Sequence, residues 1–384
     1  MPELRFDPLR SQWVAYATER NDRTFLPTDH CPLCPTGAGG ASEVPLEGFE
    51  VVVFENRFPA FGPDLRGGRP VRPSNSGGCE VIVYTPEHTL TLAQLPLERV
   101  SLLVDVWADR YRELGSRSDV AYVYIFENKG EEVGVTLHHP HGQIYALPFV
   151  PPFAQAELDA SRRHLAAAGR CLHCEEVERE LSGPRMVVSN ESLVAFVPHA
   201  ARWPYEVHLY SRRHVASIAD LDAEERLDLA RALLRVTGTY DCHFGFSTPY
   251  VMAMHQAPTD GATWPQAHLH VEFYPPHRRG DRLKYLAGVE LGAGTFVNDT
   301  RPEDTATQLR DAAGLVASQG FPGGAATGSW ASTMKTADRT IASAGGPKSA
   351  TAPSGKTRRM IDDPMRKMPP SARAMRNRRA AKRS

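Results

Sequence analysis

Two stretches of the chain place apolar side chains on one face of a helix. Residues 97–114 and 221–240 both repeat apolar positions at intervals of three and four residues. The positions are Val100, Leu103, Val104, Trp107, Tyr111 and Leu114 in the first stretch, and Leu227, Ala230, Leu234 and Thr237 in the second. Asp222, Glu224 and Glu225 give the second stretch an acidic first turn, which suits a helix dipole. The pattern therefore predicts two helices that each bury one face.

Segments rich in β-branched and aromatic residues lie on both sides of each helix. They are residues 79–84 and 120–127 around the first helix, and residues 205–211 and 250–256 around the second. Such residues favour strands. A helix between strands, used twice, predicts an α+β fold in which two halves of antiparallel sheet plus helix form one extended sheet or half-barrel.

The cysteines and histidines repeat in the same order along the chain. His139 follows His88 by 51 residues, and His268 follows His214 by 54 residues. The full series is Cys31, Cys34, His88, His139 and His141 in the first half, and Cys171, Cys174, His214, His268 and His270 in the second. This agreement indicates an internal duplication. We expect halves at residues 1–155 and 156–320, followed by a tail at 321–384.

Composition sets the protein apart from nucleic-acid and membrane proteins. The net charge of −1 combines a tail with 14 Lys/Arg and 3 Asp/Glu with an acidic body. An acidic body is not typical of nucleic-acid binding. The tail is rich in Ala, Gly, Ser and Pro, so we expect it to be disordered. The sequence has no apolar leader and no membrane-spanning run, so a cytoplasmic location is expected.

Four of the six cysteines form two Cys-x-x-Cys pairs, which favours metal or redox use over disulfides. Cys31, Cys34, His88 and His139 make a Cys₂His₂ set that suits tetrahedral zinc and leaves no open position, so the metal would be structural. Ligation of His139 would also fix the strand that carries His141. A redox dithiol and metal-free cysteines are the alternatives.

Residues 138–143 read His-His-Pro-His-Gly-Gln and carry the strongest catalytic signal. A neutral imidazole such as His141 is a competent nucleophile near pH 7. Pro140 stiffens the backbone, and Gln143 offers an amide donor beside the nucleophile. The competing interpretation is a polar, histidine-rich loop without catalytic function.

This run, together with four other segments, resembles the galactose-1-phosphate uridylyltransferase family. The other segments are residues 31–34 (Cys-Pro-Leu-Cys), 84–88 (Tyr-Thr-Pro-Glu-His), 126–130 (Phe-Glu-Asn-Lys-Gly) and 268–276. The resemblance implies a duplicated histidine-triad-like fold, a zinc at the first Cys₂His₂ set and a homodimer with a shared site. It also implies ping-pong transfer of UMP from UDP-glucose to galactose 1-phosphate through uridylylated His141, with Gln143 stabilising the phosphoryl group.

The resemblance also implies substrate contacts. Arginines 20 and 23 would lie near the pyrophosphate, although solvated loop charges are the alternative. The remaining positions are Asn56 and Phe58 for the nucleotide, Asn128 and Thr136 for the uridine and phosphate side, and Lys284, Val289 and Glu290 for the sugar. Arg57 stands where the family has an acidic residue, which weakens the expected ribose contact.

A second metal has two possible locations. The duplication predicts a second Cys₂His₂ zinc at Cys171, Cys174, His214 and His268, and this is our prediction. In bacterial relatives the resemblance implies instead a site of one Glu and three His. Glu157, His255 and His270 match that set as the alternative second site, whereas Glu272 replaces the last histidine.

Gln143 also separates two functions. Hydrolases of the same superfamily usually carry a third histidine there, so the sequence favours a transferase. The alternative is a related nucleotidyl phosphorylase or hydrolase acting on dinucleoside polyphosphates or other UDP-sugars. A zinc-stabilised binding protein that uses its basic tail on RNA or DNA is a third possibility from a different class.

Overall fold

The structure is a computed structural model that describes residues 3–27, 30–36, 42–44, 46, 48–62, 65–66, 69–70 and 77–319. The expected disordered tail, residues 321–384, lies outside this part of the chain.

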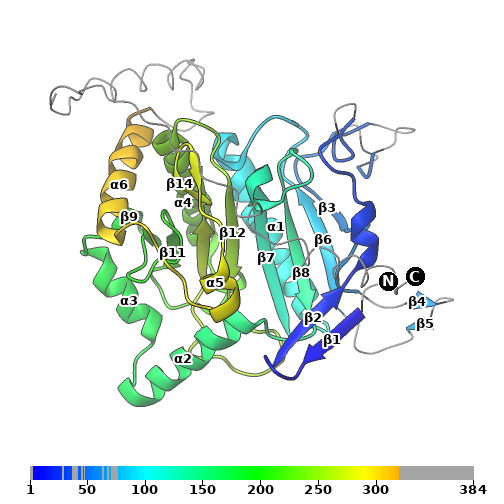
Figure 1. Ribbon diagram of the computed structural model, residues 1–384, viewed down its shortest axis with the longest axis horizontal. Helices are drawn as coiled ribbons and strands as arrows, with labels where there is room; N and C mark the ends of the chain where they lie inside the picture. The colour runs from blue at the N-terminus through cyan, green and yellow to red at the C-terminus, as the bar shows by residue number, and fades with distance from the viewer. Residues whose placement is uncertain are drawn as a thin grey trace, which may run out of the picture. The chain divides into compact units, whose positions relative to one another are not determined.

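One continuous sheet of nine strands forms the centre of the described structure (Figure 1). Every neighbouring pair of strands is antiparallel. In spatial order the strands are β3 (Val52–Glu55), β6 (Gly78–Val83), β8 (His141–Leu147), β7 (Tyr122–Lys129), β12 (Tyr250–His255), β13 (His270–Tyr274), β11 (Val207–Ser211), β10 (Leu193–Phe196) and β9 (Met186–Ser189). The first four strands come from the first half of the sequence and the last five from the second, so the β7–β12 pair joins them. The predicted α+β architecture with an antiparallel sheet is confirmed.

Both predicted helices cover the same face of this sheet. Helix α1 (Leu97–Gly115) buries all six apolar positions that the sequence pattern selected, and Trp107 is among the largest fully buried side chains. Helix α4 (Ala223–Phe244) begins at the N-cap Asp222, whose side chain accepts a hydrogen bond from the Glu225 N–H, and ends at Gly245 in the left-handed conformation. The main apolar core lies between these helices and the sheet.

The opposite face of the sheet is covered by elements that the periodicity did not predict. Helices α2 (Pro152–Ala168) and α3 (Leu172–Leu181) cover the second half. The hairpin β1 (Glu3–Asp7) and β2 (Gln12–Tyr16) and the 3₁₀ helix η1 (Thr18–Asp22) belong to the first half. Helix α6 (Pro302–Gln319) packs on α4, and the short elements β4 (Leu65–Arg66), β5 (Arg69–Pro70), β14 (His277–Arg279), β15 (Arg282–Leu283) and α5 (Gly288–Ala293) complete the described chain apart from short 3₁₀ turns.

Strand β8 shows how the sheet positions polar side chains. Successive side chains of a strand point to opposite faces. Gly142, Ile144 and Ala146 are buried, whereas His141 and Gln143 alternate with them and are only partly covered. Residues His141 and Gln143 therefore lie on the face of the sheet opposite α1 and α4.

Candidate active site and metal centres

His141 begins strand β8 with one ring nitrogen already engaged. Its Nδ1 lies 2.7 Å from the His139 carbonyl oxygen. A carbonyl only accepts, so Nδ1 carries the proton and Nε2 keeps its lone pair. Burial lowers the pKa of His141 below 6.5, although the His139 carbonyl opposes this. The imidazole is therefore neutral at pH 7 and has a free nucleophilic nitrogen.

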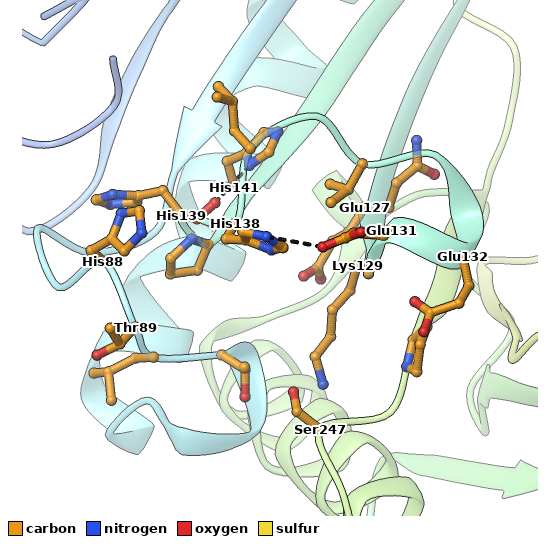
Figure 2. A pocket seen from close by; sticks show the side chains of 18 of the residues that line it. His88, Thr89, Glu127, Lys129, Glu131, Glu132, His138, His139, His141 and Ser247 are labelled. Atoms are coloured by element: carbon orange, nitrogen blue, oxygen red, sulfur yellow. Dashed lines mark hydrogen bonds and ion pairs between the residues drawn. The ribbon is translucent and has the colours of Figure 1, made fainter. Parts of the chain in front are cut away.

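A cavity of about 580 Å³ adjoins His141 (Figure 2). Asn128, Lys129 and Glu127 from the end of β7 contribute to its wall, and Thr89 and Ser247 add hydroxyl groups. His138 Nε2 lies 3.3 Å from Glu131 Oε1, so the first histidine of the motif pairs with a glutamate of the same wall. A cavity of this size falls within the range of small-molecule sites.

Gln143 is held by two donors on the same face of the sheet. Its Oε1 lies 3.3 Å from the Tyr145 hydroxyl and 3.5 Å from Asn56 Nδ2. Arg20 Nη1 donates in turn to the Tyr145 hydroxyl at 3.0 Å, and the Phe58 N–H donates to Asn56 Oδ1 at 2.8 Å. Because the amide oxygen is occupied, the amide NH₂ of Gln143 is the group left to donate to a ligand. Tyr145 was missed by the sequence analysis, although its position two residues after Gln143 places it on the same face.

Arg23 lies beside Arg20 and donates from Nε to the Arg20 carbonyl at 3.0 Å. Burial and the positive charge of Arg20 lower the pKa of Arg23. Two neighbouring guanidinium groups favour a bound anion. Thr136 lies in the loop before the motif, where its carbonyl accepts from the Leu26 N–H at 2.8 Å.

The expected sugar-side residues lie elsewhere. Lys284 is buried and its Nζ lies 3.2 Å from Glu290 Oε1, while Val289 is exposed. Of the predicted substrate residues, only Asn128 lines the cavity beside His141. The residues that do not line it are Lys284, Val289 and Glu290, and also Arg20, Arg23, Asn56, Phe58, Thr136 and Gln143.

The first Cys₂His₂ set is assembled in space. Cys34 Sγ lies 3.4 Å from both His88 Nδ1 and His139 Nδ1, and Cys31 Sγ lies 3.9 Å from His139 Nδ1. Ligands around tetrahedral zinc, with Zn–S about 2.3 Å and Zn–N about 2.1 Å, would be about 3.6 Å apart. His139 Nε2 lies 2.7 Å from the Thr85 carbonyl oxygen, which fixes its Nδ1 lone pair toward the sulfurs. The donor set fits a zinc ion.

The second Cys₂His₂ set repeats this geometry. Cys174 Sγ lies 3.4 Å from His214 Nδ1 and 3.6 Å from His268 Nδ1, and Cys171 Sγ lies 3.8 Å from His268 Nδ1. Burial and the neighbouring Cys171 raise the pKa of Cys174 to about 12, so this thiol needs a cation to ionise near pH 7. His268 Nε2 lies 2.7 Å from the Ser211 carbonyl oxygen, as His139 does from Thr85.

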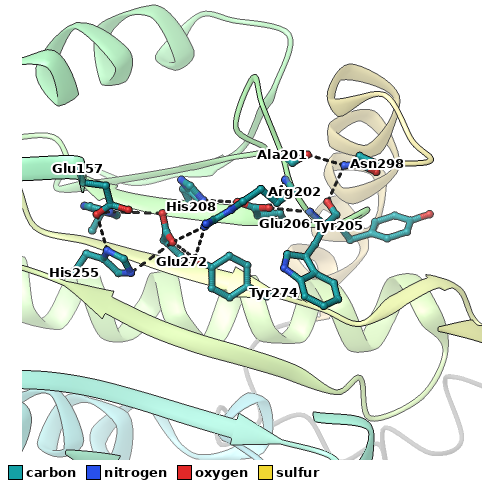
Figure 3. Close-up of polar contacts among 12 residues, drawn as sticks. Glu157, Ala201, Arg202, Tyr205, Glu206, His208, His255, Glu272, Tyr274 and Asn298 are labelled. Carbon is teal, nitrogen blue, oxygen red and sulfur yellow. Dashed lines mark hydrogen bonds and ion pairs between the residues drawn. The ribbon is translucent and has the colours of Figure 1, made fainter. Parts of the chain in front are cut away.

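The alternative second site is assembled as well, and it includes Glu272. His255 Nδ1 lies 2.7 Å from Glu157 Oε2, and His270 Nε2 lies 3.7 Å from Glu272 Oε1. Figure 3 shows that Glu272 also meets Arg202 (Nη2–Oε2 3.3 Å). The sequence predicted these two sets as alternatives for one second metal, but the structure assembles both from different residues.

Comparisons with known proteins cover both halves. The model of the galactose-1-phosphate uridyl transferase N-terminal domain matches residues 1–151, and that of the C-terminal domain matches residues 157–319. The galactose-1-phosphate uridylyltransferase of Thermotoga maritima is 40% identical over 319 residues, covering 81% of this chain and 98% of the relative. The enzyme of the same name from Streptomyces lividans is 38% identical over 328 residues, covering 81% of this chain and 87% of the relative.

Two solved structures show the same fold. A uridylyltransferase structure superposes with a TM-score of 0.73 at 37% identity, covering 82% of this chain and 99% of that one. An ADP-glucose phosphorylase from Arabidopsis thaliana with bound ADP-glucose superposes with a TM-score of 0.63 at 24% identity, covering 81% of this chain and 98% of that one.

Proposed function

Because the chain belongs to the galactose-1-phosphate uridylyltransferase family, with its duplicated histidine-triad-like fold, we propose that it transfers a uridylyl group from UDP-glucose to galactose 1-phosphate. The observation that carries the proposal is His141. Its Nδ1 is committed to a backbone carbonyl, and its ring lines a cavity of adequate size.

The reaction has two displacements at phosphorus. His141 Nε2 attacks the α-phosphorus of UDP-glucose, the bond to the bridging oxygen breaks, and glucose 1-phosphate leaves with the electron pair. A phosphate oxygen of galactose 1-phosphate then attacks the same phosphorus, the P–N bond breaks, and UDP-galactose forms. The His139 carbonyl holds Nδ1–H through both steps, so His141 leaves the cycle neutral, as it entered it.

Two groups on the substrate face suit the charge of these phosphates. The amide NH₂ of Gln143 donates to a non-bridging oxygen of the reacting phosphoryl group. Arg20 donates to the hydroxyl of Tyr145, which contacts Gln143, and Arg23 lies beside Arg20, so both positive charges lie near Gln143. Asn56 and Phe58 belong to the same hydrogen-bonded cluster and are assigned to the nucleotide, and Asn128 and Thr136 to the uridine and phosphate side.

We propose structural zinc at both Cys₂His₂ sets. The donor atoms of each set lie within 4.8 Å of one another, and His139 and His268 each donate a hydrogen bond from Nε2–H to a backbone carbonyl oxygen. With all four positions filled by protein, zinc supplies cross-linking rather than Lewis acidity. The chain's contribution at the first set is to anchor His139 and, through it, the backbone of His141.

A homodimer with a shared site accounts for the sugar-side residues. Lys284, Val289 and Glu290 belong neither to the cavity beside His141 nor to the hydrogen-bonded cluster around Gln143 in their own chain. The hairpin β1–β2 exposes Phe6 and Trp13, which suits a contact with a second copy. We therefore assign the sugar contacts to residues 284–290 of the second copy.

We further propose that residues 1–155 and 156–320 form the two halves of the enzyme and that it works in the cytoplasm. The cysteines, none of which is disulfide-bonded, support a reducing compartment. Within the described residues, no helix is long and apolar enough to cross a membrane.

The product identifies the function. Incubation with UDP-glucose and galactose 1-phosphate should give UDP-galactose and glucose 1-phosphate, and uracil-labelled UDP-glucose alone should leave label on the protein. The label should be lost in acid and retained in base, as expected for a phosphoramidate. Free UMP would indicate the alternative hydrolase, and release of a nucleoside diphosphate on addition of phosphate would indicate the alternative phosphorylase.

A further inference from the structure

Residue 142 is a glycine because the Tyr84 side chain occupies the space that a side chain at this position would need. It lies between His141 and Gln143, so a side chain there would point to the opposite face of the sheet. A Cβ built on Gly142 would lie 2.3 Å from the Tyr84 hydroxyl oxygen and 3.1 Å from Tyr84 Cζ. The φ of Gly142 is not positive, so space rather than backbone conformation requires the glycine. The Tyr84 hydroxyl therefore crosses β8 behind the catalytic motif.

Burying the Tyr84 hydroxyl in this way is energetically unfavourable. Tyr84 follows β6, is fully buried, and its ring meets Trp107 of α1 with centroids 6.3 Å apart. Its hydroxyl has no hydrogen-bond partner among the residues that the structure describes. Phenylalanine would fill the same space without an unpaired polar atom. Packing alone does not explain the hydroxyl.

Glu127 of β7 lies on the face of the sheet toward which a side chain at Gly142 would point. Strand β7 pairs Phe126 with Gln143, and one further step of this register places Glu127 opposite Gly142. Glu127 is 3% exposed and accepts a hydrogen bond from the Tyr250 hydroxyl at 3.3 Å. Burial raises the pKa of the Tyr84 hydroxyl, and the charge of Glu127 raises it further.

Among the described residues Glu127 forms no salt bridge, although the charge of Lys129 lowers its pKa against the effect of burial. The Lys129 ammonium, two residues along the strand, lies 3.2 Å from Asp241 Oδ1 and is paired there. A buried carboxyl without a paired cation needs hydroxyl donors. Tyr250 supplies one at 3.3 Å, whereas the Tyr84 hydroxyl forms no hydrogen bond to Glu127.

We propose that Tyr84 and Glu127 are positioning residues that fix the backbone between His141 and Gln143 from behind. The inference rests on the proposed function, because it assigns these two residues to the uridylyl transfer. The Tyr84 hydroxyl acts through Gly142 and does not line the cavity, whereas the Glu127 carboxyl lies beside Gly142 and also contributes to the cavity wall. They keep the nucleophile and the amide donor at the separation that one phosphoryl group requires.

Tyr84→Phe removes only the hydroxyl and separates this role from packing. We expect kcat to fall about tenfold, KM for UDP-glucose to stay within about twofold, and Tm and zinc content to be unchanged or higher. The matched control is Tyr111→Phe, whose buried hydroxyl donates to the Ala257 carbonyl at 3.0 Å, away from the motif. The control should lower Tm and leave kcat unchanged.

A double variant tests the contact itself. Gly142→Ala should lower kcat more than a hundredfold, because its methyl group meets the Tyr84 hydroxyl. Adding Tyr84→Phe should restore part of this loss, since the closest atom is removed, whereas adding Tyr111→Phe should restore none. Glu127→Gln should lower kcat as Tyr84→Phe does, and the two changes together should cost no more than one alone.

Two outcomes would overturn the proposal. An unchanged kcat in Tyr84→Phe, or a Gly142→Ala variant that Tyr84→Phe fails to rescue, would show that the hydroxyl has no positioning role. In both cases an active unmodified protein leaves the proposed function standing. An unmodified protein that makes no UDP-galactose would contradict the proposed function and this inference together.

Discussion

The two halves of the protein place the same histidine in opposite surroundings. His141 and His270 both direct Nδ1 at the carbonyl oxygen two residues earlier, at 2.7 and 2.9 Å. In both halves that earlier residue is the buried histidine of a Cys₂His₂ set, held by a carbonyl through Nε2 at 2.7 Å. The ring orientation that suits a nucleophile therefore belongs to the repeat and is not special to the first half.

The difference lies in what faces Nε2. His141 lines an open cavity, and the residue two positions on is the neutral Gln143. His270 Nε2 faces the carboxylates of Glu157 and Glu272 at 3.8 and 3.7 Å and is stacked against Tyr210. An anionic phosphate cannot approach a histidine so enclosed. The strand geometry is the same for both histidines. On the proposed function, the groups around Nε2 determine that His141, and not His270, can act as the nucleophile.

The largest expected effect is the difference in activity between the variants His141→Ala and His270→Ala. His141→Ala should abolish protein labelling and lower the exchange rate by about 10⁴-fold or more, because the covalent route is lost. Zinc content and Tm should change little. His270→Ala should lower Tm through the loss of a buried, hydrogen-bonded ring, with kcat per folded molecule retained. Labelling that survives His141→Ala would contradict the assignment of the nucleophile.

The two Cys₂His₂ sets should differ in their link to catalysis. Elemental analysis should find about two zinc per chain, falling to about one in Cys171→Ser/Cys174→Ser and in Cys31→Ser/Cys34→Ser. Both variants should unfold at lower temperature by several degrees or more. Only the variant of the first set should also lose kcat, because His139 carries the carbonyl that orients His141. One zinc in the unmodified protein, or two in either variant, would refute this arrangement.

The carboxyl groups of the two halves also differ, since Glu272 forms an ion pair with Arg202, whereas the nearby Lys129 pairs with Asp241 and not with Glu127. Burial raises the pKa of Glu127 to about 7 in the folded protein, above its unfolded value near 4.5, so the folded state binds more protons between these values. Stability should therefore fall as pH rises from 4.5 to 7, and Glu127→Gln should remove about 2 kcal/mol of that fall. Urea unfolding at pH 5 and pH 8 measures it. Equal pH dependence in the two proteins would show that Glu127 ionises normally.

The smallest effect is expected from the tail. A chain ending at residue 320 should keep its zinc, its oligomeric state and its activity, with a free energy of unfolding within about 0.5 kcal/mol of the full chain. Sedimentation and denaturant unfolding compare the two proteins. A shortened chain that loses metal or dissociates would give the tail a structural role.

Sequence patterns predicted those parts of the molecule that local spacing determines, such as a continuous apolar face of a helix or a repeated set of metal ligands. Helices α1 and α4 were predicted because their apolar faces are continuous, and the Cys₂His₂ sets because their spacing repeats. Helix α6 was missed because its buried face is built largely from small residues such as Ala306 and Ala313, which carry little periodic signal. The place of Tyr84 behind Gly142 depends on strand pairing between residues far apart in sequence, which no local pattern contains.

Strand β7 meets β12 at the centre of the sheet, and this pairing has an evolutionary consequence. A single repeat would expose β7 as an unprotected edge, open to any other strand. Joining two repeats in one gene makes the covering strand a permanent part of the same molecule. The second repeat, in which Glu272 stands two residues after His270 as Gln143 does after His141, thereby protects the first from edge-to-edge aggregation whether or not it takes part in the chemistry.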